Sequence, residues 1–395
     1  MSSEKSLTPQ IRFKEFTEAW EQRKLGELSS SFEYGLNAAA KEYDGENKYI
    51  RITDIDDDSR EFKQEDITSP DTDLSSAENY RLSEGDILFA RTGASVGKSY
   101  IYKASDGLVY YAGFLIRARI KPEYNSEFVF QNTLTGDYEK FIKVTSMRSG
   151  QPGVNAQEYS QCQIMVPSKT EQDKISNCLR NLDNLITLHQ RKLDALKKIK
   201  SALLEKMFPK NGSNVPEIRF TGFTEAWEQR KANELCTIGT GKSNTQDQVL
   251  NGLYPFYIRS DIPVRSNKYL YDCEAVITIG DGNIGRVFHY VNSKFDLHQR
   301  CYKMTGFQNV WGKYFYYFFS TRFYDRAMKM TAKATVDSVR LEMISEMDIL
   351  KPTEINEQKK IADFFTHLDN LITLHQRKLD ALKKIKSALL EKMFV

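Results

Sequence analysis

The chain has 395 residues, of which 40% are hydrophobic and 28% charged, so it is long enough for two or three globular domains. No run of about 18 apolar residues could span a bilayer. The start, MSSEKSLTPQ, is typical of neither a signal peptide nor a transit peptide, so we expect a cytoplasmic protein without membrane contact. The net charge of +3 does not indicate a nucleic-acid partner by itself, because such binding depends on clustered Lys and Arg side chains.

The cysteines give no sign of a disulfide framework or a metal site. There are five of them, scattered and without a C-x-x-C pair. An odd, dispersed set argues against structural disulfides and against zinc, so we expect mostly buried thiols and no metal.

The first predicted element is an opening segment that occurs twice. IRFKEFTEAWEQRK starts at Ile11, and IRFTGFTEAWEQRK starts at Ile218. Its aromatic residues are expected to anchor the segment on a neighbouring helix: Phe16 and Trp20 in the first copy, Phe223 and Trp227 in the second. The chain is therefore read as two tandem halves.

A variable module follows each opening segment, and the two modules keep landmarks in the same order. YIRITDI at 49–55 matches YIRSDI at 257–262, and ILFARTGASVGKSYIY at 87–102 matches AVITIGDGNIGRVFHY at 275–290. Further on, EQDKI at 171–175 matches EQKKI at 357–361. The modules have thus diverged from one ancestral unit.

The glycine-rich stretches at the second landmark resemble nucleotide-binding motifs. GASVGKS, from Gly93 to Ser99, is one residue short of the phosphate-loop signature, and GDGNIG, from Gly280 to Gly285, imitates a dinucleotide fingerprint. Both are followed by β-branched and aromatic residues rather than a helical pattern, whereas a phosphate loop needs a helix after it. We therefore predict a tight, polar or basic turn between two strands, able to approach a phosphate backbone or a groove.

A long helix follows each module. LDNLITLHQRKLDALKKIKSALLEKMF occurs at 182–208 and at 368–394, identical over all 27 positions. It lacks Gly and Pro and carries one apolar stripe at spacings of three and four, which predicts a helix of roughly 30 residues, about 45 Å long. PKNGSNVP ends the first copy.

So long a stripe needs a partner, and its own copy is the simplest one. We expect the two helices to pair antiparallel about a pseudo-twofold axis. The alternative is that each helix packs only on its own module. The residues expected at the helix-pair interface are Leu182, Leu185, His189, Leu193, Leu196 and Leu203, with Leu368, Leu371, His375, Leu379, Leu382 and Leu389 in the second copy.

Catalytic motifs are absent from the sequence. We find no D/N-P-P-Y/F loop of an amino-methyltransferase, no nuclease arrangement of acidic residues and lysine in the required order, and neither G-x-S-x-G nor H-E-x-x-H. His189 and His375 share one helix position and are read as stripe residues rather than catalytic groups. The sequence therefore predicts no catalytic residues.

This architecture closely resembles the specificity subunit of type I restriction-modification systems. The resemblance rests on the duplicated module with its fixed helix, on YIR, on the hairpin GDILFARTGASVG at 85–97, and on the Pro before E-Q-x-K-I. It implies an α+β fold: a tandem pseudo-twofold duplication of two mixed α/β target recognition domains, separated by two long antiparallel coiled-coil helices. The expected segments are 1–166 and 211–351 for the recognition domains, and 167–210 and 352–395 for the helices.

The resemblance also implies a function. Each domain would read one half of a bipartite site on double-stranded DNA, while the helices fix the gap and dock two methyltransferase subunits. Two restriction subunits would then join. No cofactor is expected in this chain; S-adenosylmethionine, ATP and Mg would belong to the partner subunits.

The residues expected to contact DNA are Arg, Asn and Gln, which can read base edges, together with Lys, Ser, Thr and Asp at the predicted turns. They are Arg51, Arg91, Thr92, Ser95, Lys98, Arg148, Gln151 and Asn155 in the first module, and Arg259, Asp281, Asn283, Arg286, Arg300, Lys333 and Arg340 in the second. Arg51 and Arg259 have a second interpretation, as partners of Asp54 and Asp261. The loop MRSGQPGVN at 147–155 could equally be an ordinary connector.

Two other functions stay open at the level of sequence. One is a coiled-coil scaffold that joins two protein-binding modules without touching DNA. The other is an ATPase that uses Gly93 to Ser99; it predicts that Lys98→Ala abolishes ATP turnover, whereas we expect no turnover.

Overall fold

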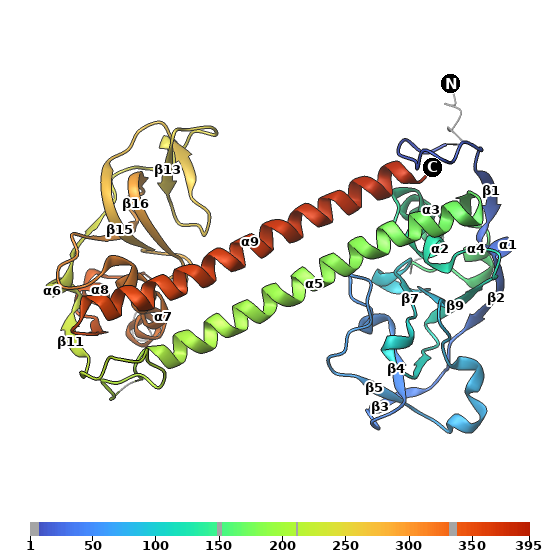
Figure 1. The fold of residues 1–395 in the computed structure, drawn as a ribbon, viewed down its shortest axis with the longest axis horizontal. Coiled ribbons are helices and arrows are strands. Elements are labelled where there is room, and N and C mark those ends of the chain that lie inside the picture. Colours follow the sequence, from blue (N-terminus) through green and yellow to red (C-terminus); the bar gives the residue numbers. More distant parts are fainter. Residues whose placement is uncertain (1–7, 148–151, 211, 332–337) are drawn as a thin grey trace. The chain divides into compact units, whose positions relative to one another are not determined.

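The computed structural model describes residues 8–147, 152–210, 212–331 and 338–395, and the chain forms two compact units (Figure 1). Unit 1 is Met1–Arg191 with Gln376–Val395, and unit 2 is Lys192–His375. Each unit therefore combines one variable module with a segment of both long helices. The boundaries predicted at 166, 210 and 351 follow the repeats instead, and they stay a prediction.

Unit 1 is built on two four-stranded sheets, with strand orders β2-β9-β6-β7 and β3-β5-β4-β8, and a two-stranded sheet, β1-β10. Its strands are β1 (Glu21–Lys24), β2 (Ser29–Tyr34), β3 (Ala39–Glu42), β4 (Lys48–Ile50), β5 (Thr68–Asp71), β6 (Ile87–Ala90), β7 (Ser99–Ile101), β8 (Val109–Tyr111), β9 (Leu115–Ile120) and β10 (Gln163–Val166). Its shorter helices are α1 (Leu25–Leu28), α2 (Ser126–Asn132), α3 (Gly136–Ser146) and α4 (Ala156–Ser160).

Unit 2 has one six-stranded sheet, β12-β17-β15-β16-β13-β14, and a two-stranded sheet, β11-β18. Its strands are β11 (Glu228–Lys231), β12 (Thr237–Thr240), β13 (Tyr254–Tyr257), β14 (Val264–Ser266), β15 (Tyr271–Ile279), β16 (Phe288–Leu297), β17 (Cys301–Thr305) and β18 (Asp348–Lys351). Its shorter helices are α6 (Ala232–Leu235), α7 (Gly312–Thr331) and α8 (Leu341–Ser345).

The two units differ in sheet number because one strand of unit 2 replaces two strands of unit 1. In unit 1 a turn at Ala104–Asp106, followed by Gly107 with φ of +82°, separates β7 from β8. In unit 2 β16 runs unbroken: its start pairs with β15, and its end pairs in parallel with β13, as β8 does with β4. The Asp-Gly turn of unit 1 thus splits what unit 2 keeps as one sheet.

The long helices are longer than the sequence pattern predicts. α5 spans Lys169–Met207 and α9 spans Ile355–Met393, 39 residues each, or about 58 Å at 1.5 Å per residue. The residues ahead of the repeated 27-mer contain neither Gly nor Pro and extend each helix back to just after Pro167 and Pro352. The diverged part of each half therefore supplies the first three turns.

The helices run antiparallel, and each unit shows it with the same ion pair. In unit 1 the Lys386 Nζ lies 2.6 Å from Asp183 Oδ1, and in unit 2 the Lys200 Nζ lies 2.5 Å from Asp369 Oδ1. Asp183 and Asp369 share one position of the 27-mer, and the two lysines share another, near its end. An early residue of one helix therefore meets a late residue of the other, which confirms the antiparallel arrangement.

The predicted interface residues divide between this pairing and the cores of the units. Leu182, Leu193, Leu368 and Leu379 are buried, whereas Leu185 is 45% exposed. The others are partly buried, and Leu196 and Leu203 pack against the core of unit 2 as Leu389 does against that of unit 1. The late part of each helix thus packs on the module of the other half, which the alternative interpretation did not expect, and the interface set as a whole stays a prediction.

The duplicated opening segment ties together the ends of both helices in each unit. The Ile11 N–H donates to the Lys392 carbonyl at the end of α9, while Arg12 binds Glu171 at the start of α5 with two hydrogen bonds of 2.8 Å. Trp20 then packs edge-on against Phe394. The predicted anchoring of this segment on helices is confirmed.

Unit 2 repeats these contacts with the roles of the two helices exchanged. Ile218 N–H donates to the Lys206 carbonyl at the end of α5, and Arg219 binds Glu357 at the start of α9 at 2.7 and 2.8 Å. Trp227 packs against Phe208.

Three of the cysteines, Cys162, Cys236 and Cys301, are buried as expected, and burial raises the pKa of each thiol to about 12. Cys178 is exposed. In the part of the chain that the structure describes, no helix combines the length and apolarity needed to cross a membrane.

Candidate nucleic-acid interface

The glycine-rich turn of unit 1 joins two strands, as predicted. β6 pairs with β7, and Gly93–Ser95 forms a single 3-10 turn between them. Gly97 has φ of +85°, and a Cβ there would lie 2.6 Å from Ile142 of α3. Glycine is thus required by backbone conformation and by close packing on a helix, with no helix N-terminus behind the turn to receive a phosphate.

The matching turn of unit 2 has the same construction. Gly280 to Gly285 lies between β15 and β16, and a Cβ on Gly285 would lie 2.9 Å from the Tyr324 Cα of α7. Packing on α7 thus accounts for Gly285, and a strand rather than a helix follows the turn, so neither hairpin has the strand-to-helix geometry of a nucleotide-binding loop.

In unit 1 the hairpin lies against the glycine-rich loop that the sequence also singled out. The Arg91 N–H donates to the Phe114 carbonyl at 3.1 Å, and the Val154 N–H donates to the Arg91 carbonyl at 2.9 Å. A β-bridge joins Thr92 to Gly153. Two segments some 60 residues apart thus form one edge, which holds Arg91, Thr92 and Asn155 together.

Unit 2 repeats this backbone frame. The Gly280 N–H donates to the Arg300 carbonyl at 2.8 Å, the Val339 N–H donates to the Gly280 carbonyl at 2.7 Å, and a bridge joins Asp281 to Ser338. Gly280 therefore stands where unit 1 has Arg91, Asp281 where it has Thr92, and Arg300 where it has Phe114.

These equivalences correct the sequence alignment by one residue in two places. The alignment set Ile279 against Arg91, but the hydrogen bonds set Gly280 there. It also matched YIR with YIR, yet the Ala112 N–H donates to Ile50 and the equivalent His298 N–H donates to Tyr257. Strand register follows burial and backbone pairing, which a short identical tripeptide does not reveal.

In unit 1 two exposed aromatic rings hold Arg91. Its guanidinium lies 5.0 Å from the centre of the Tyr34 ring and 5.8 Å from that of Phe114. Tyr34 is 43% exposed and Phe114 59% exposed, and the buried Arg91 Nε has no partner among the described residues. Sequence reasoning missed both rings; the only signal was that Phe114 follows a glycine between two buried strands.

In unit 2 three of the predicted residues form one network. Asp281 accepts hydrogen bonds from Arg259 at 3.0 Å and from Arg300 at 2.8 Å. Partial burial acts to raise the pKa of Asp281, but the hydrogen bonds from the two arginines outweigh it and lower that pKa. Burial first, and then the same two arginines, lower the pKa of the adjacent His298.

Two residues are placed differently from the expectation. The Lys98 ammonium is buried, pairs with Asp57 and donates to the Ile55 carbonyl at 3.2 Å, so it holds the 55–63 loop and is not available to a phosphate. Arg51 binds Asp54 through two nitrogens at 2.9 and 3.0 Å, which confirms its structural interpretation. Arg259 pairs with Asp281 rather than with Asp261.

The other predicted residues lie around the same turns. Asn155 caps α4 by accepting from the Glu158 N–H, Arg286 stacks on the Tyr324 ring at 4.1 Å, and Arg340 pairs with Glu342 at 2.7 Å. Ser95 is half-buried and Asn283 is exposed. Arg148, Gln151 and Lys333 lie outside the described residues, and the assignment of the whole set to DNA contact stays a prediction.

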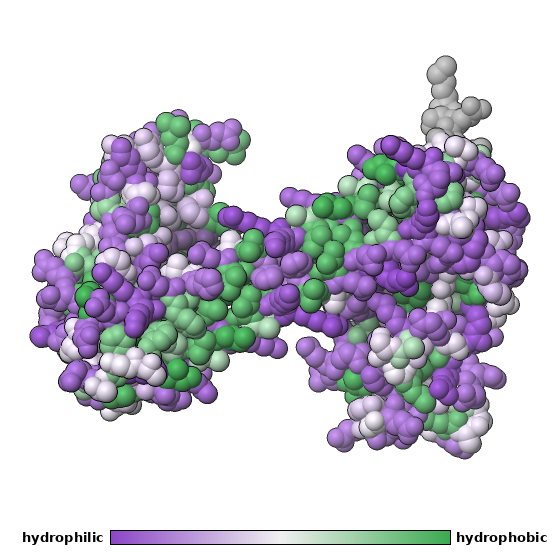
Figure 2. Space-filling model, in the orientation of Figure 1, coloured by the Kyte–Doolittle hydropathy of each residue, from purple (hydrophilic) through white to green (hydrophobic). Residues whose placement is uncertain are grey.

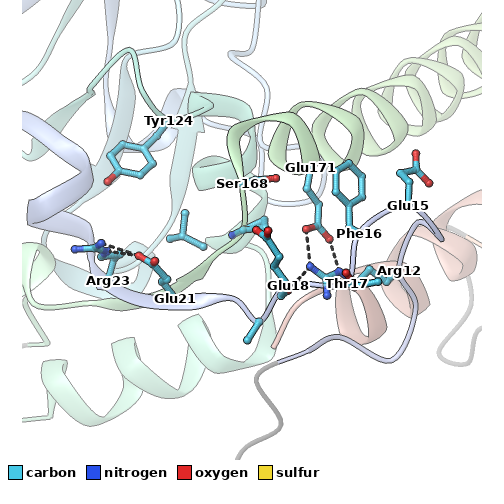
Figure 3. A pocket seen from close by; sticks show the side chains of 13 residues that line it. Arg12, Glu15, Phe16, Thr17, Glu18, Glu21, Arg23, Tyr124, Ser168 and Glu171 are labelled. Atoms are coloured by element: carbon cyan, nitrogen blue, oxygen red, sulfur yellow. Dashed lines mark hydrogen bonds and ion pairs between the residues drawn. The ribbon is translucent and has the colours of Figure 1, made fainter.

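A polar pocket lies beside the start of α5 (Figure 3). Its most buried charge is Glu171, and Arg12 binds it from the opposite wall while donating also to the Glu18 carbonyl. Both carboxylate oxygens of Glu171 thus accept a hydrogen bond from Arg12. We therefore interpret the pocket as the packing contact between the opening segment and α5, with a structural role. Across the described ranges of the chain, no group of three or more His, Cys, Asp or Glu side chains is arranged to hold a metal ion.

Comparisons with known proteins agree with this architecture. The curated MjaVIII type I restriction enzyme specificity subunit of Methanocaldococcus jannaschii is 21% identical over 78% of each chain. The putative MjaX specificity subunit of the same organism is 26% identical over 50% of this chain and 47% of its own.

The crystal structure of a type I restriction-modification S subunit from M. genitalium has a similar fold. Its TM-score is 0.75 at 14% identity, over 98% of this chain and 99% of that one. The family model for the type I restriction modification DNA specificity domain matches residues 17–198 and again 224–384. The chain therefore belongs to the type I restriction modification DNA specificity family, with two copies of its domain in tandem.

Proposed function

We propose that this protein is the non-catalytic reader of a bipartite DNA site, with one half-site bound by each unit. The observation that carries the proposal is the shared backbone frame at the turns of both units, which displays different side chains. Unit 1 presents Arg91 between aromatic rings, whereas unit 2 presents two arginines around Asp281. Two similar scaffolds with different polar surfaces suit two unlike half-sites.

The long helices are proposed to set the gap between the half-sites and to dock two methyltransferase subunits. Outward apolar side chains recur at the same positions in both copies: Leu188 and Leu374 are both 46% exposed, and Ile199 and Ile385 are 48% and 50% exposed. Hydrophobic surface is visible along the helices in Figure 2. Two equal apolar surfaces suit two copies of one partner.

The chemistry is assigned to the partners. Methyltransferase subunits would supply S-adenosylmethionine and extrude the target adenine, and restriction subunits would supply ATP and Mg. This chain would contribute position and sequence selection.

The test is to co-express the chain with the methyltransferase subunit encoded beside it and to map methylated adenines by single-molecule sequencing. The expected result is one split motif with a fixed gap, methylated on both strands. A complex that forms but methylates no defined motif would argue against DNA reading by these units.

A matched pair of variants tests docking separately. Leu188→Glu combined with Leu374→Glu places charges on the exposed apolar positions and should abolish co-purification of the methyltransferase. Lys192→Glu with Lys378→Glu, at exposed and equivalent polar positions of the same helices, is the control and should retain it.

A further inference from the structure

Asp281 sits between two arginines that arrive from separate strands of unit 2. Arg259 follows β13, Arg300 precedes β17, and Asp281 follows β15, so three strand ends meet at this carboxylate. The Asp281 side chain is 23% exposed, whereas Arg259 and Arg300 are 43% and 60% exposed. The carboxylate therefore lies below two outward guanidinium groups and fixes both.

The hydrogen-bonding pattern leaves a specific part of each guanidinium free. Both arginines donate to Asp281 through Nη1. The opposite edge, Nε with Nη2, is the one that Arg12 uses on Glu171 and Arg219 uses on Glu357 in two-point contacts. Among the residues the structure describes, that edge of Arg259 and Arg300 has no partner.

We propose that the Arg259–Asp281–Arg300 cluster is a guanine-reading site, in which Arg300 binds the base edge and Asp281 acts as a positioning residue for both arginines. The inference rests on the proposed function, since it requires that unit 2 binds DNA. A two-point donor edge of arginine matches the O6 and N7 acceptors that guanine presents in the major groove. Arg300 is assigned to the base because it is the more exposed of the two.

A phosphate is the other anionic or acceptor-rich group that such an edge could bind. Two features favour the base. Asp281 neutralises one of the two positive charges and would repel a phosphate at short range, which weakens a purely electrostatic role. In addition, Arg300 occupies the position of Phe114 in unit 1, and a phenyl ring cannot hold a phosphate. The position is thus suited to contact with bases, whose identity differs between the half-sites.

The experiment uses the complex of the chain with its methyltransferase and compares wild type with Arg300→Ala, Arg300→Lys and Asp281→Asn. Methylated motifs are mapped, and binding is measured on duplexes in which each guanine of the affected half-site is replaced by another base or by 7-deazaguanine. Asp348→Asn, which breaks the exposed pair with Lys231 in the same unit, is the control. Arg300→Lys keeps the charge and loses the two-point edge, so it tests recognition if the alanine variant is unstable.

We expect one guanine of one half-site to become degenerate in Arg300→Ala and Arg300→Lys, with the other half-site and the gap unchanged. Discrimination against other bases at that guanine should fall by roughly 5- to 150-fold, the range for one two-point contact. Asp281→Asn should lower this discrimination less than the Arg300 variants do, because Asp281 positions the arginines and does not contact the base. On wild type, 7-deazaguanine at this position should weaken binding, and on Arg300→Ala it should have no further effect.

Three results would overturn the inference. If the methylated motif has no guanine on either strand of either half-site, guanine cannot be the base that Arg300 reads. A uniform loss of binding with an unchanged motif assigns Arg300 to a phosphate. Absence of any split motif in the wild-type complex would instead refute the proposed function itself, and this inference with it.

Discussion

At the scale of single residues, the buried pair of Arg12 and Glu171 bears on the stability of unit 1. The side chain of Glu171 is 1% exposed and that of Arg12 13% exposed. If one partner is removed, water therefore cannot solvate the charge that remains. Glu171→Gln should therefore lower the free energy of unfolding by about 3 kcal/mol, the cost of an uncompensated buried charge. Denaturant unfolding of the purified chain measures it.

The control for this prediction is an exposed ion pair between the same opening segment and the same helix. Glu15 and Lys174 pair with both side chains about half exposed, so Glu15→Gln should leave stability unchanged. The combined variant Arg12→Met with Glu171→Leu should recover most of the loss. An equal effect of Glu15→Gln and Glu171→Gln would mean that burial is not the cause.

A second residue prediction concerns pH. Burial lowers the pKa of His289, although its hydrogen bond to the Ser260 carbonyl and the charge of Asp261 act in the opposite direction. The unfolded chain therefore binds a proton near pH 6.5 while the folded unit does not. Stability of unit 2 should fall as pH drops below about 6.5.

The variant His289→Gln isolates this contribution, because it keeps a side-chain donor and cannot be protonated. Chemical unfolding followed between pH 7.5 and pH 5.5 should show a smaller loss for the variant than for wild type. Parallel curves for the two proteins would exclude His289 as the source.

Residue-level reasoning from sequence succeeded where the signal was a residue type at a turn, and failed where it depended on neighbours. The sequence predicts Arg259, Asp281 and Arg300 as DNA contacts, but nothing in their spacing shows that the three side chains lie together. Lys98 is predicted as a DNA contact because it is basic and lies at a turn, yet the 55–63 loop covers its side chain. Such contacts join residues 19 to 43 positions apart, and local periodicity carries no record of them.

At the scale of elements, two equivalent ion pairs join the antiparallel helices α5 and α9. Asp369 accepts from Lys200 and also from the Tyr317 hydroxyl at 2.8 Å. Asp369→Lys would set two ammonium groups against each other and remove the acceptor, and it should destabilise the chain by about 1 kcal/mol, since the pair is partly exposed.

The charge-swapped double variant, Asp369→Lys with Lys200→Asp, should restore part of that loss. The same two variants at Asp183 and Lys386 form the matched set in unit 1, where Asp183 accepts also from Gln131. Denaturant unfolding measures all four proteins. Failure of both double variants to improve on the single ones would show that the ion pairs do not couple the helices.

The long helices and the duplication were predictable because identity and periodicity persist over tens of residues. The starts of the helices were not, since the first turns lie in diverged sequence with weaker stripes. Nor could the split of one sheet into two be foreseen: it depends on whether a turn such as Asp106-Gly107 interrupts a strand, a local choice that the other half does not share.

At the scale of the whole molecule, unit 1 is assembled from two separate pieces of chain, whereas unit 2 is one continuous piece that holds parts of both long helices. Unit 1 needs Gln376–Val395, which is the end of α9 and the two residues after it. Phe394 in this segment packs on Trp20, and its ring centre lies 5.3 Å from that of Phe128. A fragment of residues 1–208 lacks that segment and would expose these rings. It carries an identical 27-mer at its own end, however, which a second copy of the fragment can offer in the same place.

We therefore expect fragment 1–208 to form a homodimer in which each copy supplies to the other the helix that α9 supplies in the intact chain. Phe208 would take the position of Phe394, and Lys200 would meet Asp183 of the other copy as Lys386 does here. Light scattering after gel filtration should give twice the fragment mass. Phe208→Ala should weaken the dimer, because Trp20 and Phe128 would lose their aromatic partner, whereas Lys192→Ala, at an exposed position, should not. A folded monomer would contradict this prediction. It would show that the first module is stable without a second helix, so that Gln376–Val395 is not required for its stability.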